Sequence, residues 1–215
     1  SRAPVYVRAS IFNQELFRDR IHFAAFDGIV IHAESLPGLT AAMANYQHKD
    51  WWTRPPFGTA LHELPKRTLS LLWRSGGRFG HLLPVTDRRC RTDLRGGEHG
   101  LHIGMSACRG GDSEYDSLAF VLGVDGDPYR LVEDNAALAL EAMDSPARLR
   151  KEKRYPEVLD YLGWCSWDAF YHAVDADGLL RKTAELHEQG LPVRWVMIDD
   201  GWSAVREKRL ASYDA

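Results

Sequence analysis

Two short clusters of aromatic and acidic residues stand out in the last third of the chain. They are Trp164-Cys165-Ser166-Trp167-Asp168 and Asp199-Asp200-Gly201-Trp202. An indole ring packs against the apolar C–H face of a sugar ring, and carboxylates accept hydrogen bonds from its hydroxyl groups. The clusters therefore predict a sugar-binding site, with these candidate substrate-binding residues: Trp167, Asp168, Asp199, Asp200 and Trp202.

Each cluster taken alone has a simpler explanation. A tryptophan at a strand end often fills a core, which is the alternative for Trp164. Asp199 and Asp200 could cap a helix and face solvent, or form half of a divalent-metal site. Adjacent aspartates on a strand point to opposite sides unless the backbone turns, and Gly201 allows such a turn. We predict no metal and no cofactor.

The clusters follow two apolar runs of strand length, 159–164 and 193–198. Between them we expect a helix that Asp175 or Asp177 caps and that ends near Gln189-Gly190. The second run is almost continuously apolar, which is typical of a parallel strand buried on both faces. The order strand, helix, strand predicts a βαβ unit, and function gathers at the carboxyl ends of such strands. Both clusters should therefore lie at one edge.

The upstream half has the pattern of an antiparallel β-sandwich. Asp27-Gly28 separates two apolar runs within 21–32, as in a hairpin. Residues 36–66 are less regular and are predicted to form a long loop or an edge. Further short runs predict strands at 69–73, 79–85, 101–105 and 118–124, separated by glycine-rich turns at Ser75-Gly76-Gly77, Arg95-Gly96-Gly97 and Arg109-Gly110-Gly111-Asp112.

The pattern changes after Gly126. Residues 128–143 predict a helix with Asp127 as N-cap and Pro128 in its first turn. The charged stretch that follows contains two prolines and predicts a connector. We therefore expect a sandwich-like domain over 1–144, a linker over 145–157 and an α/β domain over 158–215, which makes the fold class mixed α and β.

Composition excludes several classes of function. A net charge of −3 offers no basic surface for nucleic acid and no polybasic patch for a membrane. No apolar run approaches the roughly 20 residues of a membrane span. The three cysteines, Cys90, Cys108 and Cys165, are expected to be reduced thiols. The chain lacks both a starting Met and a signal-like stretch, so we expect a cytoplasmic protein whose N-terminus has been truncated.

The motifs also resemble a known family. YLGWCSWDAFYHAV at 161–174 and VMIDDGWS at 196–203 are similar to the raffinose synthase and alkaline α-galactosidase group of glycoside hydrolase family 36, which includes the seed imbibition proteins. Fainter likeness occurs in WWTRPPFG at 51–58 and GDPYRLVEDNAALAL at 126–140. The resemblance implies a β-sandwich followed by a (β/α)8 TIM barrel, here incomplete, of which residues 158–215 form the start.

The resemblance also implies a retaining reaction on α-galactosides. Trp167 would stack near the galactose ring, and Asp199 and Asp200 would bind its 4- and 6-hydroxyls. Asp168 would either contact substrate or fix the loop. Such a reaction needs a nucleophile and an acid/base about 5–5.5 Å apart. In this family these are aspartates of later barrel strands, one in a Lys-x-Asp motif, and no segment here matches. The catalytic pair is therefore expected beyond Ala215.

We predict a full-length glycosidase acting on raffinose-type α-galactosides, of which this chain alone is inactive. Three alternatives stay open. One is an α-galactosyltransferase similar to raffinose synthase. Another is a non-catalytic carbohydrate-binding domain that uses Trp51, Trp52 and Trp73, and the third is a structural domain without a sugar role. The expected partner is an α-galactoside, and the sequence is compatible with a homo-oligomer.

Overall fold

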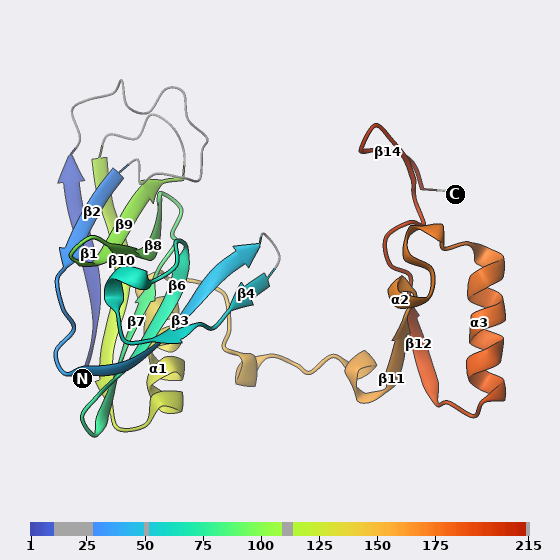
Figure 1. The fold of residues 1–215 in the computed structure, drawn as a ribbon, viewed down its shortest axis with the longest axis horizontal. Coiled ribbons are helices and arrows are strands. Elements are labelled where there is room, and N and C mark those ends of the chain that lie inside the picture. Colours follow the sequence, from blue (N-terminus) through green and yellow to red (C-terminus); the bar gives the residue numbers. More distant parts are fainter. Residues whose placement is uncertain (11–27, 50–51, 109–113, 214–215) are drawn as a thin grey trace. The chain divides into compact units, whose positions relative to one another are not determined.

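The structure, a computed structural model, describes residues 1–10, 28–49, 52–108 and 114–213. The chain divides into two compact units, Ser1–Glu152 and Lys153–Ala215 (Figure 1). Among the described residues, the first unit has one α-helix, ten strands and, before the connector, one short 3-10 turn. They are β1 (Arg2–Ser10), β2 (Gly28–Ala33), β3 (Leu39–Lys49), β4 (Trp52–Arg54), β5 (Phe57–Gly58), η2 (Leu61–Glu63), β6 (Thr68–Ser75), β7 (Arg78–Pro84), β8 (Cys90–Gly97), β9 (Gly100–Ala107), β10 (Glu114–Asp125) and α1 (Pro128–Ala142).

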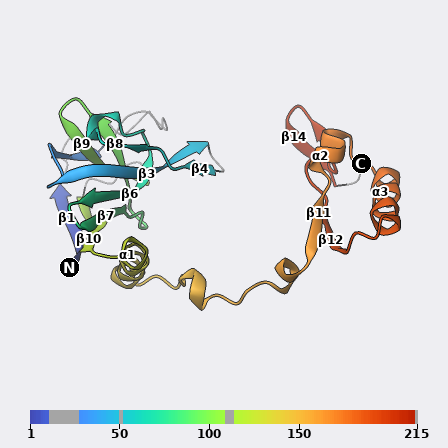
Figure 2. The same ribbon diagram turned by 60° about the horizontal axis from the view of Figure 1, so that its bottom comes forward.

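Hydrogen bonds join all ten strands into a single curled antiparallel sheet. Its order is β1-β10-β7-β6-β8-β9-β2, with β3 pairing β6 and carrying β4 and β5. One residue pair, Thr68 with Leu94, links β6 to β8, and Figure 2 shows β8 and β9 in a different layer from β7 and β10. The predicted sandwich is thus one continuous sheet whose two halves share a core. Leu71, Trp73 and Leu82 come from one half, and Leu94, Leu101, Ile103 and Met105 from the other.

The four strands predicted over 69–73, 79–85, 101–105 and 118–124 are confirmed as β6, β7, β9 and β10. The predicted turn at Arg95-Gly96-Gly97 is wrong, because these residues end β8 and the chain turns at Glu98-His99. Gly96 instead allows the backbone of another segment to approach closely. A Cβ on Gly96 would lie 2.0 Å from the carbonyl oxygen of His62.

The long loop or edge predicted over 36–66 is wrong as a loop in its first part, while the short strands β4 and β5 pair with β3 as an edge of the sheet. Residues Leu39–Lys49 form the long strand β3, which pairs with β6. Its buried positions Ala42 and Ala44 are small, so the apolar alternation is weak in the sequence. The first run and turn of the predicted hairpin, 21–27, and the turn at 109–112 lie outside the described residues, as does Trp51. The second run forms β2, which pairs with β9.

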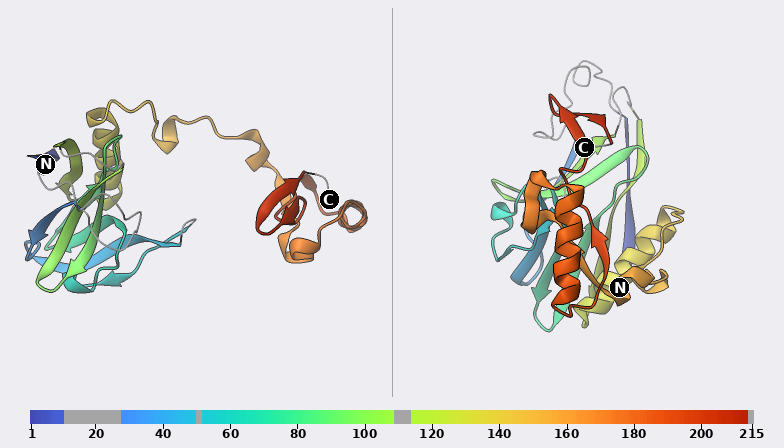
Figure 3. Two further views of the ribbon diagram at one scale, coloured as in Figure 1. Left: turned by 90° about the horizontal axis from the view of Figure 1, so that it is seen from above. Right: turned by 90° about the vertical axis from the view of Figure 1, so that its right-hand side faces the viewer.

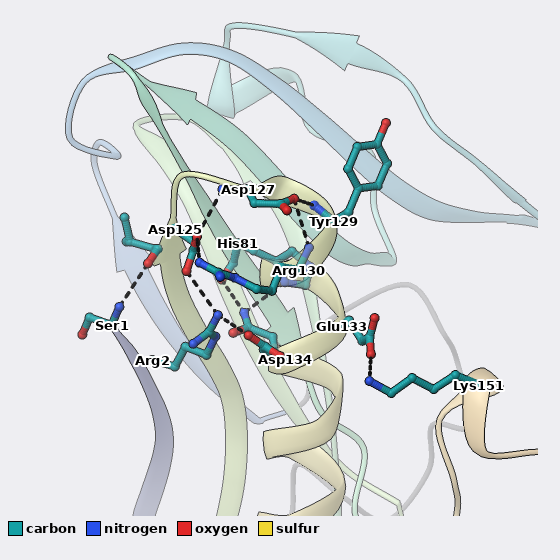
Figure 4. A network of polar contacts seen from close by, with 12 residues as sticks. Ser1, Arg2, His81, Asp125, Asp127, Tyr129, Arg130, Glu133, Asp134 and Lys151 are labelled. Carbon is teal, nitrogen blue, oxygen red and sulfur yellow. Dashed lines mark hydrogen bonds and ion pairs between the residues drawn. The ribbon is translucent and has the colours of Figure 1, made fainter.

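Helix α1 follows its prediction and covers β7 and β10. The Asp127 carboxylate accepts hydrogen bonds from the backbone N–H groups of Tyr129 (2.9 Å) and Arg130 (3.2 Å), which caps the helix (Figure 4). The buried face repeats every four residues at Leu131, Asn135 and Ala139. Ala139 packs in a second cluster with Val85, Leu118 and Val121. β10 is therefore buried on both faces.

Ion pairs fasten β1 and α1 to the end of β10 (Figure 4). The Asp125 carboxylate accepts hydrogen bonds from Arg130 (2.8 Å) and Arg2 (3.3 Å), and Arg2 also pairs with Asp134. The hydrogen bond from Arg130, followed by the backbone N–H of Asp127, lowers the pKa of Asp125 to about 2. The carboxylate of Asp125 therefore links both strand β1 and the first turn of α1 to the end of β10.

The connector after α1 is extended chain with two 3-10 turns, η3 (Arg150–Glu152) and η4 (Glu157–Asp160) (Figure 3). The second unit then contains β11 (Leu162–Cys165), α2 (Trp167–Phe170), η5 (Tyr171–Ala173), α3 (Ala176–Glu188), β12 (Val193–Met197), β13 (Ala204–Arg206) and β14 (Arg209–Ser212). The strand predicted from 159 begins only at Leu162, because η4 occupies the residues before it.

The βαβ order is confirmed, since β11 and β12 pair in parallel. Helix α3 starts at its predicted cap, where Asp175 accepts a hydrogen bond from the backbone N–H of Gly178 (2.6 Å). It ends before Gly190, whose φ is +69°. The expected burial of β12 on both faces is not seen in this two-stranded sheet, where Val196 and Met197 are 38% and 51% exposed. None of the described helices is long and apolar enough to span a membrane.

Candidate functional site

The carboxyl ends of β11 and β12 meet through Ser166. Its backbone N–H donates to the carbonyl oxygen of Met197 (3.0 Å), and its hydroxyl accepts from the backbone N–H of Asp199 (2.9 Å). The Ser166 side chain is fully buried. The structure therefore brings together the two sequence clusters, which lie more than thirty residues apart, and Ser166 is a buried side chain that joins them.

Asp199 is held at both carboxylate oxygens. Oδ1 accepts the backbone N–H of Asp200 (2.7 Å), and Oδ2 accepts the thiol of Cys165 (3.3 Å). The first of these bonds, then the second, lowers the pKa of Asp199, and the nearby His172 acts in the same direction. Hydrogen bonds to a carboxylate favour its charged form. Asp199 is therefore an oriented anion.

Asp200 is held in the same way by other partners. Its Oδ1 accepts the backbone N–H of Gly201 (2.8 Å), and its Oδ2 lies 3.4 Å from Nδ1 of His172. The turn that directs this side chain depends on Gly201, whose φ is +109°. An ionised carboxylate has about four lone-pair sites. Both aspartates can therefore accept further hydrogen bonds from a ligand's hydroxyl groups.

Trp167 begins α2, directly after Ser166. Its half-buried ring meets Tyr171 at 5.3 Å and His172 at 5.0 Å between ring centroids, in both cases nearly perpendicular. The His172 ring therefore packs against the Trp167 ring, and one of its nitrogens lies next to the Asp200 carboxylate. His172 lies inside the motif at 161–174, but its residue type and spacing there do not indicate the contact with Asp200, which joins residues 28 positions apart.

The other two predicted site residues lie at the border of this group. Asp168 is exposed in the first turn of α2, where its carboxylate accepts no hydrogen bond from the described residues. Trp202 is 44% exposed and stacks on Tyr213, with ring centroids 5.9 Å apart. Trp164 is half-buried and meets Phe170 edge-on, so it packs within the unit.

The geometry does not favour two alternatives that the sequence left open, a tryptophan platform and a metal site. Trp73 is 5% exposed and belongs to the core, so it cannot share a sugar-binding platform with Trp52. Over the residues that the structure describes, no three His, Cys, Asp or Glu side chains gather to hold a metal ion. The Asp199–Asp200 pair with Trp167 and His172 remains the most organised polar group of the second unit.

Residues 33–215 match the profile of the family described as raffinose synthase or seed imbibition protein Sip1. The chain belongs to this family. It is 32% identical over 167 residues to a galactinol–sucrose galactosyltransferase of Pisum sativum, which covers 74% of this chain and 21% of that protein. A protein of the same name from Oryza sativa subsp. japonica is 33% identical over 181 residues, covering 77% and 23%.

Stachyose synthase of Pisum sativum is a further relative, 28% identical over 74% of this chain and 19% of its own length. The chain thus spans about a fifth of the length of the curated relatives it matches. Among solved structures, a family 36 α-galactosidase from Geobacillus stearothermophilus has a TM-score of 0.44 and 9% identity, covering 79% of this chain and 26% of that one. The family resemblance of the sequence motifs is confirmed by the profile match.

Proposed function

We propose that the second unit holds the galactosyl group of an α-galactoside in an enzyme of this family. The observation that carries the proposal is the pair Asp199 and Asp200, whose carboxylates are held by hydrogen bonds and by His172, the residue that also contacts the Trp167 ring. Trp167 would stack on the sugar, and the two carboxylates would accept hydrogen bonds from its 4- and 6-hydroxyls. Asp168 and Trp202 would contact the sugar from the border of the site.

The chemistry of galactose suits this arrangement. Its axial 4-hydroxyl leaves a continuous apolar face of C–H groups, which an indole can cover. On the other side, hydroxyl groups donate to carboxylates in charge-assisted hydrogen bonds. Carboxylates already oriented by the protein lose less conformational freedom when they bind. The role proposed for Asp199 and Asp200 is therefore binding, and the nucleophile and acid/base would come from other residues.

The names of the relatives favour transfer over hydrolysis. Both reactions can pass through the same covalent galactosyl intermediate, and they differ in whether a sugar hydroxyl or water receives the galactosyl group. The relatives quoted above are named as galactosyltransferases and a stachyose synthase. We therefore place galactosyl transfer to a sugar acceptor ahead of the hydrolysis that the sequence first suggested. The incomplete (β/α)8 barrel over 158–215 is part of the same proposal.

The binding role predicts selectivity for galactose over glucose. We expect galactose to shift an indole N–H signal of the 215-residue chain in NMR titrations. Glucose, which has an equatorial 4-hydroxyl, should bind with at least tenfold lower affinity. Asp200→Ala should weaken galactose binding by about tenfold, the usual effect of losing a hydrogen bond to a charged group. Asp177→Ala, an exposed aspartate of α3, is the matched control. Equal binding of both sugars, or unchanged binding by Asp200→Ala, would contradict the role.

The transfer role predicts a product. A protein that carries this segment together with the catalytic carboxylates should form a trisaccharide when given galactinol and sucrose, with little free galactose. The 215-residue chain alone should release no p-nitrophenol from p-nitrophenyl α-galactoside. Release of galactose without any trisaccharide would favour hydrolysis. Turnover by the chain alone that survives both Asp199→Ala and Asp200→Ala would overturn the site assignment.

A further inference from the structure

We propose that His172 is a positioning residue that sets the orientation of Asp200 relative to Trp167, and so contributes to galactose selectivity. This inference rests on the proposed function. His172 Nδ1 lies 3.4 Å from Asp200 Oδ2, and its ring lies 5.0 Å from that of Trp167 at an interplanar angle of 85°. Among the described residues, His172 contacts both the aromatic ring and a carboxylate of the site.

The backbone around His172 is fixed from two sides. Tyr171, just before it, has a φ of +50°, which is unusual for a residue with a side chain. On the other side the turn after β12 approaches so closely that a Cβ on Gly201 would lie 2.7 Å from both Cα and the carbonyl oxygen of His172. The turn that carries Asp200 therefore abuts the backbone of His172, and the side-chain contact follows from this packing.

The contact with His172 restricts a side-chain torsion of Asp200 that the backbone leaves free. Gly201 holds only Oδ1 of Asp200, so the carboxylate could otherwise turn about its Cβ–Cγ bond. The His172 ring nitrogen 3.4 Å from Oδ2 restricts that torsion, and the free lone pairs then have a set direction relative to the Trp167 ring. His172 itself is 69% exposed, so the two contacts are what restrain its side chain. Both parts of the sugar site are thus ordered before the ligand arrives.

Two substitutions separate the two contacts. His172→Phe keeps a ring against Trp167 and removes the ring nitrogen next to Asp200, whereas His172→Ala removes both contacts. We expect each to weaken galactose binding by about three- to fivefold, the size of effect of an exposed polar pair. The Trp167 indole N–H signal should stay in place in His172→Phe and shift in His172→Ala. His187→Ala, an exposed histidine of α3, should change neither.

A double-variant cycle shows whether His172 acts through Asp200. In the Asp200→Ala background, His172→Phe should cause no further loss of galactose affinity, because the two residues act as one unit. Additive losses would show that His172 does not act through Asp200. Unchanged affinity in both single variants, while Asp200→Ala still weakens binding, would overturn the inference and leave the proposed function standing. If the native chain does not bind galactose, the proposed function fails and the inference fails with it.

Discussion

The first unit is expected to lose stability as the pH falls from about 6.5 to about 4, because His81 is buried as a neutral imidazole. His81 and Asn135 are both fully buried. The Asn135 amide nitrogen lies 3.0 Å from Nδ1 of His81 and donates to the His81 carbonyl oxygen (3.1 Å), while Ser70 Oγ lies 2.9 Å from Nε2. With the amide as donor, Nδ1 is the acceptor and the ring is uncharged.

The direction of the pH dependence follows from the pKa of His81. Burial lowers this pKa from 6.5 to about 4. The unfolded chain therefore binds a proton at a higher pH than the folded chain does. The contribution to stability is complete above about pH 6.5 and disappears progressively down to about pH 4. A difference of this size corresponds to about 3 kcal/mol in the free energy of unfolding.

Hydrogen exchange of the α1 and β7 amides, followed from pH 4 to pH 7, measures this effect within the first unit. The free energy of opening should fall towards low pH in the native chain, after correction for the intrinsic exchange rate. His81→Gln should remove most of the pH dependence, even though it also lowers stability at neutral pH. His99→Gln replaces an exposed histidine and should leave the pH dependence unchanged. A native profile that matches that of His81→Gln would refute the assignment.

The parts of the fold that the sequence predicts well are those with local signals. Helices α1 and α3 each begin at an aspartate whose side chain caps the backbone two or three residues later. The residues that determine the helix start therefore lie within one turn of it. Strand β3 was missed because its core positions are alanines, which carry little hydrophobic contrast. The Gly96 position was misread because glycine marks both turns and close approaches, and here the neighbour, His62, lies 34 residues away along the chain.

The same distinction applies to the candidate site. Asp199 and Asp200 could be selected because they follow an apolar strand and precede a glycine. Ser166 and His172 contact them across 33 and 28 residues of sequence, and such contacts exist only once β11 and β12 have paired. The pairing of His81 with Asn135 spans 54 residues and has no local signal either. The sequence likewise does not predict that Trp202 stacks on Tyr213, since this contact depends on the hairpin of β13 and β14.

Gly201→Ala is expected to disrupt the proposed sugar site far more than Gly190→Ala, although both replace a glycine with positive φ. Gly190 has a φ of +69° and open space around its missing Cβ, so alanine there meets only backbone strain of about 1–2 kcal/mol. Gly201 has a φ of +109°, and its Cβ would collide with the backbone of His172. A backbone neighbour cannot rotate away as a side chain can, so the turn carrying Asp199 and Asp200 must shift.

Both variants place a side chain at positive φ, and Gly201→Ala adds a φ further from the left-handed region and the collision with His172, so Gly190→Ala controls for the effect of positive φ alone. For Gly201→Ala we expect at least tenfold weaker galactose binding, since about 1.4 kcal/mol suffices for that change. The Asp199 amide, hydrogen-bonded to Ser166, should also exchange faster with solvent. Faster exchange without loss of binding would mean that the turn closes again around the sugar. Equal exchange rates in the two variants would mean that the contact between Gly201 and His172 does not hold the two strand ends together.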